Sequence, residues 1–173
     1  MQAGAYTAKI LGEHMQDSWQ TAIDGFWNQV DGKTEGELQS ELGALLTAQV
    51  PTANALFERA SLHDYLGEEA TAVGLYQQAM ASGLEGPKRS EAMIQLGSSL
   101  RNIGHAHQAV QLLKQIELED PLYLDAQGFL ALALLDAGHP ESAVASALRA
   151  LAPAMKIYSR PVQRYAQELD KRD

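Results

Sequence analysis

One arrangement of residues occurs three times in this chain of 173 residues. In each copy a small residue is followed seven positions later by a glycine, and an Ala-Val pair begins five positions after that glycine. The glycines are Gly67, Gly104 and Gly138, so the copies are 37 and 34 residues apart. Repeats of this length with a helix–turn–helix character are typical of solenoids, in which successive helix pairs stack on one another. This repeat restricts the possible folds more than any other feature of the sequence.

The composition favours an all-α protein. Hydrophobic residues make up 46% of the chain, which is ordinary for a folded protein. Ala, Leu, Gln and Glu are frequent, whereas no run of β-branched residues is long enough for a strand. The chain contains no cysteine, so it has no disulfide, no thiolate metal site and no cysteine nucleophile.

Charge and hydropathy argue against several classes of partner. The formal net charge is −9, whereas nucleic acids and anionic lipid surfaces attract basic proteins. No apolar run is long enough to span a bilayer, and the N-terminal residues do not have the basic head and apolar stretch of a secretory signal. We therefore expect a cytoplasmic protein that binds neither nucleic acid nor membranes.

Residues 1–50 are predicted to form helices of unknown type. From about residue 6 to residue 30, apolar residues recur at steps of three and four, as in one long amphipathic helix. The aromatic members of this stripe are Trp19, Phe26 and Trp27. Thr34 and Glu37 have the spacing of a capping box, which predicts the start of a second helix.

Helix-breaking residues divide residues 51–152 into three repeats, at about 53–86, 87–120 and 121–152. Within them we expect helices at 53–66, 69–81, 88–103, 106–117, 121–137 and 140–151. Thr52 and Asp120 are predicted to cap helices, and Pro87, Pro121 and Pro140 take first-turn positions, where proline loses no hydrogen bond. Residues 153–173 are predicted to contain a charged amphipathic helix that caps the end of the stack.

The second copy resembles the tetratricopeptide repeat. The residues that follow this family's spacing are Met93, Leu96, Gly97, Leu100, Ala109, Leu113 and Pro121. Gly97 and Ala109 would be the small residues that let the two helices of the pair approach closely. The stretch 83–104 also looks like a bacterial subfamily of short tetratricopeptide proteins, and the resemblance covers about residues 53–151.

The resemblance implies a right-handed α-solenoid of about three helical hairpins, with extra N-terminal helices and a C-terminal capping helix. Proteins of this family mostly bind extended peptides or partner helices on a concave face, which the first helix of each pair lines, and they are rarely enzymes. We therefore expect a protein–protein interaction module that is not an enzyme. The alternative is a structural or assembly protein, a homodimer or part of a complex, whose groove is filled by its own helix or by a helix of a partner copy.

Equivalent residues of the three first helices lie on one face. Shifts of 37 and then 34 positions relate three triplets, which are Phe57, Ser61 and Asp64, then Ile94, Ser98 and Arg101, then Gly128, Leu132 and Leu135. Steps of four and three put each triplet on one side of its helix. The expected peptide-binding groove consists of Phe57, Ser61, Asp64, Ile94, Gln95, Ser98, Arg101 and Asn102.

A different interpretation of this face stays open. Ser61 and Ser98 can be merely solvated and Arg101 can pair with a nearby acid, because exposed charges often form such pairs without a function. Arg101 and Asn102 alone resemble the cluster of Lys, Asn and Arg with which co-chaperones of the family grip an acidic C-terminal tail. We therefore do not expect that ligand.

A second set of residues could serve assembly. The first helix of the third repeat is apolar nearly all round, so Leu132 and Leu135 must be covered by the C-terminal segment, the N-terminal helix or a second copy of the chain. Trp19, Phe26 and Trp27 belong either to the core or to a helix that docks into the groove, within the chain or across a dimer.

We expect no metal site, no cofactor and no catalytic residue. His105, His107 and His139 come closest to metal-ligand spacing, but they belong to polar turns with no acid fixed nearby. Ser98 and Ser99 have no histidine or acid at a spacing that indicates a catalytic triad.

Overall fold

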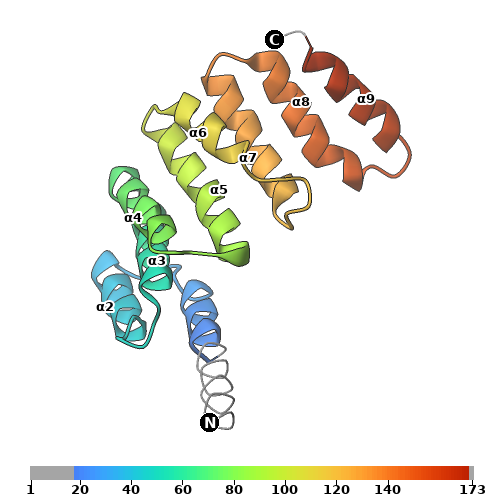
Figure 1. Cartoon of the computed structure of the whole chain (residues 1–173). Helices are drawn as coiled ribbons and strands as arrows, with labels where there is room; N and C mark the ends of the chain where they lie inside the picture. The colour runs from blue at the N-terminus through green and yellow to red at the C-terminus, as the bar shows by residue number, and fades with distance from the viewer. Residues whose placement is uncertain (1–17, 172–173) are drawn as a thin grey trace, which may run out of the picture.

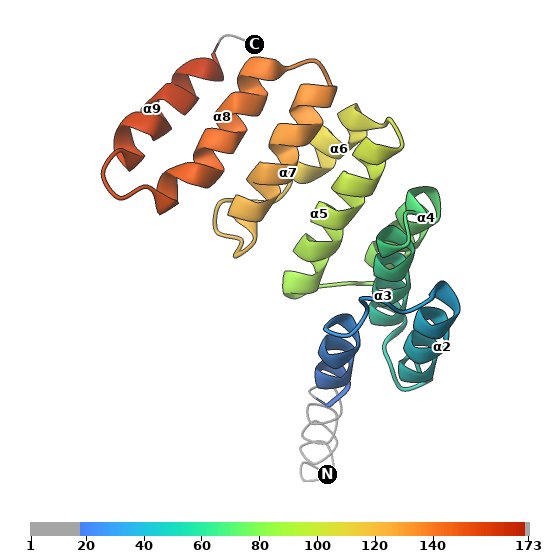
Figure 2. The same cartoon turned by 180° about the vertical axis from the view of Figure 1, so that it is seen from behind.

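The computed structural model describes residues 18–171, and within them every regular element is a helix. An N-terminal helical segment at residues 18–27 precedes α2 (Glu35–Leu45). Three hairpins follow, which are α3 (Thr52–Tyr65) with α4 (Glu69–Ala81), α5 (Gly86–Asn102) with α6 (Ala106–Leu113), and α7 (Tyr123–Asp136) with α8 (Pro140–Leu151). A single 3-10 turn (Ala152–Ala154) then leads to α9 (Ser159–Leu169). The hairpins succeed one another along a curved array, which confirms the predicted all-α fold (Figures 1 and 2).

Several helix starts agree with the sequence pattern. Thr34 forms the predicted capping box with Glu37, whose carboxylate accepts a 2.8 Å hydrogen bond from the Thr34 backbone nitrogen. Pro87 lies in the first turn of α5, and Pro140 is the first residue of α8. Only residues 18–27 of the expected long N-terminal helix can be compared, because its earlier part lies outside the described residues.

Two predicted caps are wrong. Thr52 is the first residue of α3 rather than its cap, and no side chain caps that helix. Asp120 does not cap α7, which begins only at Tyr123. The Asp120 carboxylate instead accepts a 2.8 Å bond from the backbone nitrogen of Leu122 and a 2.5 Å bond from Ser90 Oγ. Such a side-chain-to-backbone bond holds a turn at the place where helix was expected. α6 also ends four residues earlier than predicted, at Leu113.

The three repeated glycines end the first helix of each hairpin. Gly67, Gly104 and Gly138 have φ angles of 76°, 84° and 84°, in the left-handed region that favours glycine. The residue after each glycine donates its backbone N–H to a carbonyl five residues earlier, at 2.8, 2.8 and 2.9 Å. This is the Schellman ending of a helix, in which the freed carbonyls find new donors as the chain reverses. The repeat in the sequence is therefore a repeat of turn geometry.

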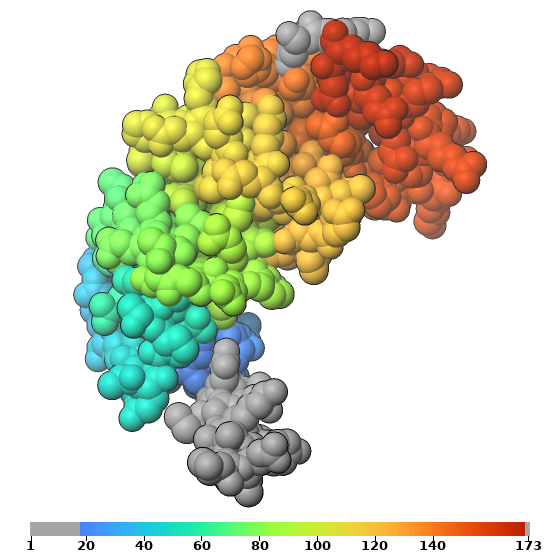
Figure 3. Space-filling model, in the orientation of Figure 1, coloured from blue at the N-terminus to red at the C-terminus, as the bar shows by residue number. Residues whose placement is uncertain are grey.

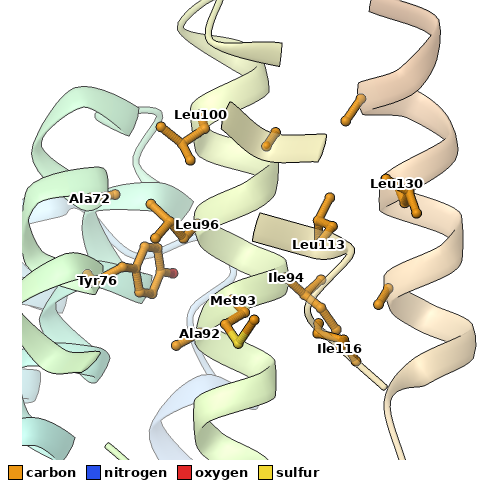
Figure 4. Close-up of a cluster of buried hydrophobic side chains, with 14 of the residues drawn as sticks. Ala72, Tyr76, Ala92, Met93, Ile94, Leu96, Leu100, Leu113, Ile116 and Leu130 are labelled. Carbon is orange, nitrogen blue, oxygen red and sulfur yellow. The ribbon is translucent and has the colours of Figure 1, made fainter. Parts of the chain in front are cut away.

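Close packing within the second hairpin explains its small residue, Gly97. A Cβ atom added to Gly97 would lie 2.8 Å from Cγ of Leu113, so α5 and α6 touch where the sequence predicted a close approach. Leu96 and Tyr76 lie side by side between α5 and α4, whereas Ile94 lies close to Leu113 (Figure 4). These side chains belong to one buried cluster that runs through the three hairpins.

A second, smaller core fixes the N-terminal segment. Its buried members are Ile23, Phe26, Val30, Leu38, Leu42 and Leu62, which come from the N-terminal segment and the residues after it, from α2 and from α3. Trp19 and Trp27 are partly buried against this cluster. The Trp19 indole nitrogen also donates a 3.2 Å hydrogen bond to the backbone oxygen of Leu45. Hydrophobic contact and this bond together hold the N-terminal segment against the array.

Candidate functional site

The array has an inner and an outer side. α3, α5 and α7 lie toward the inner side of the curve, whereas α4 and α6 lie toward the outer side (Figure 1). In the space-filling view the N-terminal segment and the beginning of α5 meet on the inner side, next to α3 (Figure 3). The side chains of these three elements surround a hollow.

This hollow is a pocket of about 430 Å³, called here the inner pocket. The residues that line it are Gln20, Ile23, Asp24 and Trp27 of the N-terminal segment, Phe57, Glu58, Ser61, Asp64 and Tyr65 of α3, and Lys88, Glu91 and Gln95 of α5. Within each element the positions are three or four residues apart or adjacent, as one helix face requires. Pockets of this size accommodate small ligands or single side chains of a partner.

The structure brings half of the predicted groove residues together in this pocket, namely Phe57, Ser61, Asp64 and Gln95. Phe57 and Ile94 are only 2% and 7% exposed and belong to the buried cluster of the three hairpins, so both offer little surface to a partner. Ser98 is half-buried and Asn102 is exposed.

Ser61 and Gln95 form part of a polar network between helices. Oε1 of Gln95 accepts hydrogen bonds from Ser61 Oγ, at 3.0 Å, and from the Tyr76 hydroxyl. The Tyr76 ring is fully buried, and burial raises the pKa of its hydroxyl well above the ordinary value. Tyr76 therefore stays a neutral donor, and the network joins α3, α4 and α5 through Ser61 and Gln95, which line the inner pocket.

Asp64 and Arg101 occupy equivalent repeat positions, and each contacts the next first helix. Asp64 Oδ1 accepts a 2.7 Å hydrogen bond from Ser99 Oγ, which links α3 to α5. Arg101 Nε lies 2.6 Å from Oδ2 of Asp136, which links α5 to α7. Arg101 is thus paired with an acid, the alternative that the sequence left open.

More acidic than basic side chains line the inner pocket, and burial affects two of its carboxyl groups. Burial raises the pKa of Asp64 above its ordinary value, although the Ser99 hydroxyl acts in the opposite direction. Burial also raises the pKa of Glu91, where Lys88 lowers it and the charge of Glu58 raises it further. Both carboxylates are therefore held in surroundings that disfavour a negative charge.

Sequence reasoning did not identify the charged half of the pocket, in particular Glu58, Lys88 and Glu91. A signal was present, since Lys88 and Glu91 precede Ile94 by six and three residues and extend the predicted stripe of α5 by nearly two turns. Trp27 was expected to lie in the core or at an assembly surface. Its ring packs against the second core, but it also lines the inner pocket.

The residues predicted for assembly separate into two groups. Phe26 is buried and Trp19 partly buried within the chain itself, as the core interpretation expects. Leu132 and Leu135 remain 44% and 57% exposed on α7. Neither α9 nor any other element that the structure describes covers these two leucines completely.

Neither a metal site nor a membrane-spanning helix is found within residues 18–171. No group of three His, Asp or Glu side chains is placed there to hold a metal ion. The rings of His107 and His139 lie near each other, with centroids 6.5 Å apart. His107 belongs to the first turn of α6 and not to a connecting turn as expected, whereas His139 directly precedes α8. None of the described helices combines the length and the apolar character needed to cross a membrane.

Comparison with known proteins identifies one family. A sequence model of that family, described as tetratrico peptide repeat, matches residues 53–169. The matched range runs from the second residue of α3 to the last residue of α9, which is more than half of the chain. No curated protein and no solved structure matches the chain.

Proposed function

Because the chain belongs to the tetratricopeptide repeat family, whose domains are generally protein–protein interaction modules, we propose that it binds a peptide or helix of a partner protein on its inner face. The observation that carries this proposal is the inner pocket of about 430 Å³ between the N-terminal segment, α3 and α5. It combines aromatic rings with several charged groups, which is the mixture that gives affinity and register at protein interfaces.

Hydrogen bonds and an ion pair connect the first helices of neighbouring hairpins on the inner face. Ser61 bonds to Gln95 and Asp64 bonds to Ser99 across α3 and α5, and the Arg101 guanidinium pairs with an acid on α7. Contacts of this kind fix the spacing of the first helices before a partner arrives. Preorganisation lowers the entropy that binding would otherwise cost.

We propose no catalytic role for the inner pocket. Domains of this family are typically non-catalytic. Ser61 and Ser99 donate to Gln95 and Asp64, and no histidine occurs among the residues that line the pocket. Ser61 therefore donates to an amide oxygen, which is not a base, and the lining residues contain no triad of serine, histidine and acid.

A second candidate function is assembly with another copy of the chain. The exposed Leu132 and Leu135 on α7 favour it, because apolar side chains in a groove gain free energy when they are covered. Light scattering of a dilution series tests this function. A dimer that Leu132→Asp/Leu135→Asp dissociates, and that Leu118→Asp at a 71% exposed site does not, would favour assembly over peptide binding.

Selection of peptides from a random library on the immobilised chain tests the proposed function, followed by NMR titration of the enriched peptides. Perturbed amides on α3, α5 and α7 are expected. Ser98→Trp places a large ring on the inner face and should abolish binding, whereas Gln111→Trp, at an exposed position of α6, should not. If no peptide is enriched, or if the perturbed amides lie only on α4, α6 and α8, the proposal is wrong.

A further inference from the structure

The charges of the inner pocket do not balance. Four carboxylates line it, from Asp24, Glu58, Asp64 and Glu91, whereas Lys88 is its one cation. Lys88 Nζ lies 2.9 Å from Glu58 Oε1, and the other oxygen of Glu58 accepts a 2.8 Å bond from the Trp27 indole. Glu58 is 1% exposed, so this pair is internal and complete. The remaining three carboxylates have no cation of their own among the residues that the structure describes.

Those three carboxylates have neutral donors. Asp24 accepts from the Gln20 amide at 2.8 Å and Asp64 accepts from the Ser99 hydroxyl at 2.7 Å. The Gln95 amide lies 3.4 Å from a Glu91 oxygen. Such bonds satisfy single lone pairs but add no positive charge, and for Asp64 and Glu91 the surroundings are also partly desolvated, whereas Asp24 is exposed.

The aromatic walls of the pocket suit a cation. The rings of Trp27 and Tyr65 meet edge to face, with centroids 6.4 Å apart, at one side of the pocket. On another side, the Lys88 ammonium already lies 4.7 Å from the centroid of the Phe57 ring. Aromatic faces attract ammonium and guanidinium groups, and long basic side chains also bury their methylene stems against such rings. Lys88 shows within this chain how a basic side chain fits between a ring and a carboxylate.

We infer that the inner pocket receives a lysine or arginine side chain of the partner peptide, whose charged end lies between Asp64 and Glu91 and whose stem lies against Trp27 and Tyr65. This inference rests on the proposed function and specifies the partner's chemistry. Charge complementarity selects the occupant, because the chain as a whole is acidic, with a net charge of −9. An acidic peptide, by contrast, would add negative charge to a pocket that already has an excess.

The surface next to the inner pocket also bears on the sequence of the partner peptide. Leu132 and Leu135 are exposed on α7, at repeat positions equivalent to Ser61 and Asp64 of α3. A peptide that follows the inner face from α3 toward α7 therefore passes from an acidic to an apolar surface. We therefore expect the partner peptide to carry apolar residues at some distance from its basic residue, on either side of it.

NMR titration of the full chain with two small probes of similar size is the first test. Nα-acetyl-lysine methylamide is expected to shift the Trp27 indole signal and the amides of Asp64 and Glu91, whereas Nα-acetyl-norleucine methylamide is not. Equal shifts from both probes would show that the pocket does not distinguish charge, which overturns the inference. Shifts from the lysine probe at exposed acids elsewhere, with none in the pocket, would overturn it as well.

The second test uses the library-selected peptides and two double variants that lose the same charge. Asp64→Asn/Glu91→Gln keeps the shape of the pocket, and Glu117→Gln/Glu119→Gln removes two exposed carboxylates outside it. Peptide affinity should fall about tenfold or more in the first variant. It should change no more than about twofold in the second, because exposed charges contribute little. Melting followed by circular dichroism verifies that both variants fold.

The outcomes separate the two proposals. Peptides that bind the inner face with equal affinity to both double variants would overturn the basic-residue inference and leave the proposed function intact. Failure to find any peptide that binds the inner face would refute the proposed function, and with it this inference.

Discussion

The indole Nε1 of Trp27 donates a 2.8 Å hydrogen bond to Oε2 of Glu58. This contact joins the N-terminal segment to α3, and it lies at the edge of the inner pocket. Because the second oxygen of Glu58 pairs with Lys88 on α5, one buried carboxylate connects three separate elements. The N-terminal segment is therefore part of the site as well as of the fold.

Glu58→Ala should destabilise the protein by about 3 kcal/mol, because it leaves the Lys88 ammonium and the Trp27 N–H without their partner. Urea unfolding followed by tryptophan fluorescence measures this loss. Glu41→Ala is the matched control, since Glu41 pairs with Lys33 at the surface and should contribute at most about 1 kcal/mol. Equal losses in the two variants would show that the Glu58 contacts do not stabilise the fold.

Gly97→Ala should destabilise the protein by about 1–3 kcal/mol, although alanine is the better helix former. The new Cβ would lie 2.8 Å from Cγ of Leu113, which is 1% exposed and cannot move freely. Gly74→Ala in α4 is the control, because nothing lies within 4 Å of the Cβ that it adds. That change should stabilise by about 0.5–1 kcal/mol, so opposite signs in thermal unfolding are expected.

The repeats could be predicted because their signals are local. The glycines at 67, 104 and 138 report a backbone conformation, and Gly97 reports a close contact within one hairpin. Both signals depend only on residues that are close in the sequence or that belong to the same helix pair. The caps at Thr52 and Asp120 were wrong because side chains of this kind also hold turns, and only the folded chain decides between the two uses.

The site could be predicted only in part, because it depends on contacts between distant elements. Helical periodicity placed Ser61, Asp64 and Gln95 on one face, where the pocket has them. It did not reveal that Trp27 comes to the same place, since the N-terminal segment docks through a separate core. Helical periodicity also did not show that Ile94 is buried, because a residue at the edge of an apolar stripe can face either the core or the solvent.

Tyr76→Phe should destabilise the protein by about 1 kcal/mol, the usual contribution of one buried hydrogen bond. The ring keeps its place in the core, but Gln95 loses the hydroxyl that donates to its side-chain oxygen. Chemical denaturation measures the loss. Tyr158→Phe is the control, because Tyr158 is 64% exposed and should give almost no change. No difference between the two variants would show that the polar network does not hold the first two hairpins together.

Glu91→Gln should stabilise the protein at neutral pH, and the gain should disappear in acid. Burial raises the pKa of Glu91 in the folded protein above the ordinary value of 4.5, with the charges of Glu58 and Asp24 acting in the same direction and Lys88 against them. Between these two pKa values the folded state binds more protons than the unfolded state, so the stability of the natural protein falls as the pH rises through the folded pKa. A glutamine does not titrate and avoids this loss.

The measurement is the difference in free energy of unfolding between Glu91→Gln and the natural protein at a series of pH values. Groups far from Glu91 titrate alike in both proteins, so the difference reports Glu91 together with the neighbouring charges that act on it. It should be smallest near or below pH 4.5, grow as the pH rises, and become constant above the folded pKa. Glu117→Gln, in the exposed turn after α6, is the control, and it should change the free energy of unfolding little because an exposed charge contributes little. A stabilisation by Glu91→Gln that is largest in acid would have the opposite sign and would mean that the pocket favours the charged carboxylate.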